Sequence, residues 1–218
     1  MPARPFPDVL DGEAVAQHVG AGGRFSVWGP YEFMTDRSLA VSYMEILWAD
    51  VWERPIVGFD VKCDFNRVCV VQLTTGRLAL VLDALALEAD VMQAMLQPLL
   101  GHGRVCKVFH GHCNVLNCLA SDIGIVVSGP IFDTAANAQQ LCGTWQEEPP
   151  SLQLLCRQYL NYEMDTTLQT ANWRQRPLSA EMLQYAAIDA QVLLPLQAGI
   201  EDAMYSRAWG YDWEQSIL

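Results

Sequence analysis

Positive charge, and lysine above all, is scarce in this sequence. Its 218 residues carry 13 Lys and Arg against 25 Asp and Glu, a formal net charge of −12, and Lys62 and Lys107 are its only lysines. Proteins that bind nucleic-acid backbones on their own normally present a strongly basic face. The composition therefore disfavours tight, autonomous binding to RNA or DNA.

Long hydrophobic runs are also lacking. The apolar stretches over 78–87 and 123–127 are interrupted by Asp or Gly, well short of the roughly 20 residues that a membrane-spanning helix needs. We expect no membrane span.

The even cysteine count of a disulfide framework is missing too, because the chain has 7 cysteines, most of them within apolar runs. This predicts reduced thiols in an intracellular, reducing compartment, either cytoplasmic or organellar.

The order of the expected elements predicts an α/β fold. Three strand candidates, 56–60, 67–74 and 78–83, follow each other so closely that they must form an antiparallel meander. Helix and strand patterns then alternate, which is typical of strands added in parallel to the same sheet. We expect one domain over 1–218, with a central mixed five-stranded sheet of three antiparallel strands plus two parallel strands, flanked by helices.

Further elements follow from hydrophobic periodicity. Residues 1–55 form an N-terminal extension, with a short strand over 25–28 and a helix over 36–51, that we expect to pack on this domain. The remaining expected elements are helices 88–100, 114–122, 134–141, 151–160 and 179–204, and strands 105–109 and 125–132.

Polar residues with recognisable spacing follow several of these elements. In chain order the motifs are Gly58-Phe-Asp60, Val71-Gln-Leu-Thr74, Lys107-Val-Phe-His110, Phe132-Asp-Thr134, Ser151 to Leu160, Leu168 to Leu178 and Tyr185-Ala-Ala-Ile-Asp189-Ala190. Together they resemble the RNase D-like (DEDDy) branch of the 3'-5' exonucleases, over about residues 56–196. The resemblance implies a ribonuclease H-like fold.

The resemblance also implies a site that this chain retains only in part. The family holds two divalent metals, Mg²⁺ or Mn²⁺, with four carboxylates, and such metals activate water for phosphodiester hydrolysis. Asp60 and Asp189 match two of these carboxylates, and Tyr185 matches the residue that orients the attacking water. Lys62 stands in place of the family's Glu, and Val115 in place of its second-motif Asp.

An ammonium among the remaining carboxylates repels a divalent cation, by several kcal/mol at an effective dielectric of roughly 20. We therefore expect no metal at the vestigial ligands Asp60 and Asp189, no other cofactor, and a Lys62 ammonium that hydrogen-bonds one or both carboxylates in the place of the metal.

Four other residues are weak candidates for nucleic-acid binding: His110, Trp173, Arg174 and Arg176. His110 belongs to a family motif. The other three either contact a nucleic-acid backbone or pack their loop on the sheet and pair with acids, and we favour the second interpretation.

Two functions remain open. The first is a catalytically degenerate exonuclease-like protein, a non-catalytic protein-binding or RNA-adaptor subunit of a larger ribonucleoprotein or organellar complex. The acidic composition favours protein partners over RNA, which we expect to bind weakly. The alternative is an active metal-dependent 3'-5' exonuclease with an atypical site.

Overall fold

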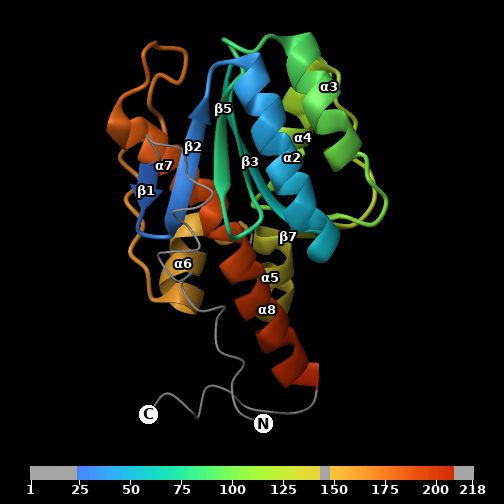
Figure 1. Ribbon diagram of the computed structural model, residues 1–218. Helices are drawn as coiled ribbons and strands as arrows, with labels where there is room; N and C mark the ends of the chain where they lie inside the picture. The colour runs from blue at the N-terminus through green and yellow to red at the C-terminus, as the bar shows by residue number, and fades with distance from the viewer. Residues whose placement is uncertain (1–23, 143–147, 209–218) are drawn as a thin grey trace.

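The computed structural model describes residues 24–142 and 148–208, so the first 23 residues of the expected N-terminal extension lie outside it. A seven-stranded mixed sheet lies between two layers of helices (Figure 1). No helix of the described residues is both long enough and apolar enough to cross a membrane.

The centre of the sheet is the expected antiparallel meander. The strands are β1 (Arg24–Ser26), β2 (Gly29–Met34), β3 (Ile56–Asp64), β4 (Arg67–Thr74), β5 (Ala79–Asp83), β6 (Cys106–Phe109) and β7 (Ile131–Asp133). Their order across the sheet is β1-β2-β5-β4-β3-β6-β7. Strand β4 pairs antiparallel with β3 and β5, whereas β6 and β7 continue the sheet in parallel from β3.

The predicted number of strands was wrong by two. Strands β1 and β2 come from the N-terminal extension, and β2 pairs in parallel with β5, which makes the extension an integral part of the sheet. The sequence hides β2 because it begins with Gly29 and Pro30, a turn signal, and carries the charged Glu32, which is nevertheless buried.

The helices lie close to their expected positions. They are α2 (Arg37–Glu53), α3 (Ala89–Leu100), α4 (His112–Cys118), α5 (Thr134–Cys142), α6 (Leu152–Leu160), α7 (Ala180–Gln191) and α8 (Leu193–Ala208). The expected start of the last helix is correct, since Ser179 caps α7 by accepting a hydrogen bond from the Met182 backbone at 3.2 Å. The predicted single helix over 179–204 is divided into α7 and α8 at Val192.

The segment from 112 to 133 contains one expected helix and one expected strand. The helix predicted over 114–122 is confirmed, with α4 continuing into a turn of π-helix over Leu119–Ile123. The predicted strand 125–132 is reduced to β7, because Gly129 adopts a φ of +83° immediately before Pro130 and the chain leaves the extended conformation there.

Alternation along the strands divides the core between the two faces of the sheet. Val57, Phe59 and Val61 of β3 face α2, α3 and α4 and belong to the largest hydrophobic cluster. The intervening residues of β3 face α7. Val70 and Val81 of the neighbouring strands pack under α7 on the same face. Any polar group at position 58, 60 or 62 is therefore held against α7.

Candidate functional site

Strand β3 places Asp60 and Lys62 on the face that α7 covers. They are two residues apart and so point to the same side of the sheet. Antiparallel pairing with β4 sets Asp60 opposite Gln72 and Lys62 opposite Val70, and the register shifts immediately after Lys62. The two side chains therefore project together from the last regular stretch of the strand.

Helix α7 brings Tyr185 and Asp189 to the same place, because residues four apart lie on one face of a helix. The helix lies close to β3 at its carboxyl end. A Cβ atom at Gly58 would lie 3.1 Å from the Ala190 carbonyl oxygen and 2.9 Å from the Thr74 Cγ2 atom. Only glycine leaves room for this approach, which is what allows Asp189 to reach β3.

The Lys62 ammonium lies between the two retained carboxylates, as the sequence predicts. Its Nζ atom donates to Asp60 Oδ2 at 2.7 Å and also to Asp189 Oδ2. The exposed fractions of the three side chains are 13% for Lys62, 19% for Asp60 and 3% for Asp189. The three groups thus form a largely buried triad with a net charge of −1.

Burial and mutual attraction oppose each other in this triad. Burial disfavours the Lys62 ammonium, but the charges of Asp60 and Asp189 outweigh it and raise the Lys62 pKa. Burial raises the pKa of Asp189 to about 6, even though Lys62 attracts its ionised form. Lys62 therefore stays protonated at neutral pH, and its charge is part of the site.

Two aromatic rings complete the surroundings of the ammonium. The Lys62 Nζ atom lies 5.1 Å from the centroid of the Tyr185 ring and 5.8 Å from that of Trp173. The two rings lie 6.0 Å apart and are inclined by 37°. Such contacts stabilise a desolvated cation by about 1–2 kcal/mol. Burial also raises the pKa of the Tyr185 hydroxyl to about 12, so the phenol stays neutral.

Val115 does not join this group of polar side chains. It lies on α4, is buried, and belongs to the largest hydrophobic cluster together with Phe59 and Phe109. The position where the family's motif has an acid is thus part of the apolar core.

The structure shows that Arg176 is used inside the protein. Its Nε and Nη2 atoms each lie 2.6 Å from a carboxylate oxygen of Asp83, and the remaining donors reach the carbonyl oxygens of Cys69 at 2.9 Å, Trp173 at 2.9 Å and Gln175 at 2.7 Å. All the donor nitrogens of the guanidinium therefore have partners.

Trp173 and Arg174 also make contacts within the protein, Trp173 through its ring and Arg174 through an ion pair. Only 3% of Trp173 is exposed, and Arg174 pairs with Asp64 at 3.1 Å near the protein surface. These positions favour packing and ion pairing over contact with a nucleic acid, which is the interpretation that the sequence analysis favours.

His110 follows β6 directly and contacts the first residue of α5. Its Nδ1 atom lies 2.9 Å from the Thr134 hydroxyl oxygen, which itself donates to the Phe109 carbonyl oxygen at 3.1 Å. Burial lowers the pKa of His110. The neutral imidazole therefore links β6 to the start of α5, and Asp60 of the triad is one of the charges that act on it.

Comparison with known proteins agrees with this arrangement of strands and helices. A family model described as "3'-5' exonuclease" matches residues 58–204, about two thirds of the chain. The chain belongs to the 3'-5' exonuclease family. Within this family it is RNase D-like, and the predicted ribonuclease H-like α/β fold is confirmed.

Several relatives of this exonuclease domain are much longer proteins. Protein RRP6-like 3 of Arabidopsis thaliana is 37% identical over 57% of this chain and 13% of its own length. Human exosome complex component 10 is 32% identical over 69% of this chain and 16% of its own length. The structure of Escherichia coli RNase D has a TM-score of 0.70 at 20% identity, covering 82% of this chain and 46% of that one. The chain spans less than a fifth of the two sequence relatives.

The residues at this site do not fit the two divalent metals that the family's chemistry requires. A metal held by Asp60 and Asp189 would have to share their oxygens with the Lys62 ammonium, and a cation inside the ligand set opposes metal binding. Among the residues described, no group of three or more His, Cys, Asp or Glu side chains is arranged to hold a metal ion.

Sequence reasoning missed two parts of the site. The first is Asp83, which forms an ion pair with Arg176. The sequence places it only at the end of a strand, although a single acid at the end of an apolar strand could have indicated a buried ion pair. The contact of the Trp173 ring with the Lys62 ammonium could not be predicted from the sequence, because a tryptophan near two arginines is equally typical of a nucleic-acid-binding site.

Proposed function

We propose that this exonuclease domain is catalytically degenerate and serves as a non-catalytic, protein-binding subunit of a larger assembly. The observation that carries the proposal is the Lys62 ammonium bound to both Asp60 and Asp189. This internal cation contacts one oxygen of each carboxylate that would otherwise hold a metal, and it neutralises one of their two negative charges.

Three further features support this role. Val115 supplies a hydrocarbon where the family's motif supplies an acid. Trp173 and Arg176 are occupied by contacts within the protein. The charge of −12 disfavours tight binding to RNA by the domain alone and favours protein partners.

The relatives' names agree with membership of an assembly, since several are described as components of the exosome complex. We also propose that the protein acts in a reducing compartment, which suits the 6 free cysteines of the described residues.

A nuclease assay tests the proposal. The native chain and an Asp189→Asn variant are incubated with Mg²⁺ or Mn²⁺ and 3'-end-labelled single-stranded RNA or DNA. We expect the same background release of label from both proteins. The competing function, an active metal-dependent 3'-5' exonuclease with an atypical site, is favoured by the family match itself. It predicts release by the native chain that the Asp189→Asn substitution abolishes.

A further inference from the structure

Helix α2 has more apolar surface than the fold buries. One side of the helix faces the sheet and contributes Ala40, Tyr43, Met44, Leu47 and Val51 to the core. The adjacent flank of the helix, on the side of α3, also carries large apolar side chains, among them Val41, which is 42% exposed, and Trp52, which is 70% exposed. The apolar surface of the helix therefore extends beyond the face that the core covers, and this flank is available to a partner.

The outer residues of α2 follow a regular helical stripe. Val41, Glu45, Trp48 and Trp52 are separated by four, three and four residues, the spacing at which side chains of one helix interlock with those of another. Helix α3 presents a matching stripe of Val91, Ala94, Met95 and Pro98, spaced as i, i+3, i+4 and i+7. Two such stripes side by side form the walls of a groove for a third helix.

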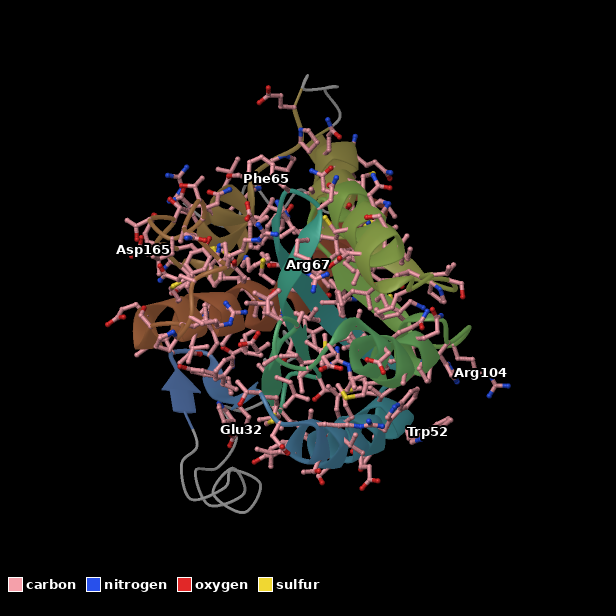
Figure 2. All side chains as sticks on the ribbon, turned by 90° about the horizontal axis from the view of Figure 1, so that it is seen from above. Glu32, Trp52, Phe65, Arg67, Arg104 and Asp165 are labelled. Atoms are coloured by element: carbon pink, nitrogen blue, oxygen red, sulfur yellow. The ribbon has the colours of Figure 1, made fainter. Side chains whose placement is uncertain are left out.

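The surface between these stripes is hollowed. A depression of about 290 Å³ lies between α2 and α3, and a second of about 160 Å³ lies near the carboxyl end of α2. Trp48 lines both depressions, which therefore adjoin at this residue, and the two together are hereafter called the α2–α3 groove. Figure 2 shows Trp52 and Arg104, from the second depression, projecting outward on the side of the molecule where α2 lies.

The exposed Trp52 is held in a fixed position. Its ring centroid lies 5.8 Å from that of Trp48 and 5.9 Å from that of His102, and the His102 ring is nearly perpendicular to it, at 89°. A tryptophan that is already positioned loses little conformational freedom on binding, which is why such residues dominate the binding energy of protein interfaces.

The charged residues of the α2–α3 groove indicate which charges a helix bound there must carry. Glu45 lies at the middle of the stripe, is exposed, and makes no salt bridge with any residue in the described part of the chain. Arg37 and Arg104 stand near opposite ends and are likewise without a carboxylate partner among the described residues. The complementary ligand has a basic residue at its centre and acidic residues toward its ends.

We propose that the α2–α3 groove binds an amphipathic helix of a partner protein, with one Lys or Arg inside its apolar stripe. The inference names a docking surface for the protein-binding role proposed above and rests on that role. The groove lies on the α2 side of the sheet and the Lys62 triad on the α7 side, so the two can be tested separately. A nucleic acid fits the groove poorly, because its central charge is a carboxylate.

Photo-crosslinking in the source cells tests this proposal with the full chain. Benzoylphenylalanine replaces Val41 in the groove or, as the control, Leu154 on α6, another partly exposed apolar residue. We expect a protein crosslink at position 41 that is absent at position 154. Mapping should place it in a helical segment whose apolar stripe contains one basic residue.

Variants then identify the contacts. Trp52→Ala should weaken binding of the captured segment, made as a synthetic peptide, by about thirtyfold or more. Tyr205→Ala is the matched control, since Tyr205 on α8 is 67% exposed against 70% for Trp52, and it should leave affinity unchanged. Glu45→Lys should weaken binding by about tenfold, and replacing the basic residue of the peptide with Glu should restore it.

Several results would overturn the proposal. They are a crosslink at position 41 to nucleic acid, to lipid or to a second copy of this chain, a crosslinked segment whose apolar stripe lacks a basic residue, or no crosslink above the control. Absence of a groove crosslink while other proteins co-purify would refute the groove and leave the non-catalytic role standing. Nuclease activity that depends on Asp189 would refute that role and leave the groove intact.

Discussion

Replacing Lys62 with methionine should strongly destabilise the domain at neutral pH. The methionine keeps most of the side chain's volume but removes the cation that contacts both Asp60 and Asp189. Since Asp189 is 3% exposed and Asp60 19%, the substitution leaves two largely buried carboxylates facing each other without a counter-charge. Removing one partner of a buried ion pair typically costs about 3–5 kcal/mol in the free energy of unfolding.

The loss should shrink as the pH falls. The Asp189 pKa is already raised to about 6 by burial, and removing the attraction of Lys62 raises it further. A carboxyl group whose pKa is higher in the folded state takes up its proton there first, so stability increases as the pH falls through that pKa. The methionine variant should therefore recover part of its stability near pH 5.

Urea unfolding at pH 7 and pH 5, followed by circular dichroism, measures both effects. Arg77→Met is the control, because Arg77 pairs with Asp50 and Glu53 on the surface and such pairs contribute about 1 kcal/mol or less. If Lys62→Met does not fold, the double variant with Asp189→Asn should fold, since it removes the more deeply buried of the two uncompensated charges and the repulsion between them. A loss below about 1 kcal/mol at pH 7 would refute the argument that the ammonium holds this site together.

Other consequences follow from the same contacts. In the native chain, the raised Asp189 pKa should make the free energy of unfolding fall by about 2 kcal/mol between pH 4 and pH 7 relative to Asp189→Asn. Unfolding at a series of pH values measures this difference, and equal slopes for the two proteins would contradict it. Arg176→Met should lower the free energy of unfolding by about 3–5 kcal/mol because it removes the counter-charge of the buried Asp83. Arg174→Met, whose pair with Asp64 is near the surface, should change it by about 1 kcal/mol or less. Both substitutions should have the same effect on RNA affinity in a filter-binding assay at matched salt. A loss of affinity in Arg176→Met alone would assign Arg176 to an RNA site.

Much of the site could be predicted from the sequence because its parts lie on regular elements. A spacing of two on a strand and of four on a helix fixes which side chains share a face. Asp60, Lys62, Tyr185 and Asp189 could therefore be brought together without coordinates. The family motifs supplied the remaining fact, that β3 and α7 are neighbours.

The parts that could not be predicted depend on contacts between distant segments. Strand β2 exists because β5 offers it a parallel edge, which outweighs the local turn signal of Gly29 and Pro30. The bidentate contact between Arg176 and Asp83 joins residues 93 positions apart. The outer stripe of α2 was predicted only as part of a helix, because periodicity alone does not tell a face that the fold covers from one that it leaves open.

The central claim is that an ammonium has replaced the metals of this exonuclease domain. Its most direct test is a titration with Mn²⁺, in which free Mn²⁺ is followed by electron paramagnetic resonance for the native chain, Asp189→Asn and Lys62→Glu. We predict no saturable binding by the native chain beyond that of Asp189→Asn, and a gain of binding in Lys62→Glu, where a carboxylate replaces the cation. Stoichiometric binding of Mn²⁺ by the native chain that is lost in Asp189→Asn would contradict the account.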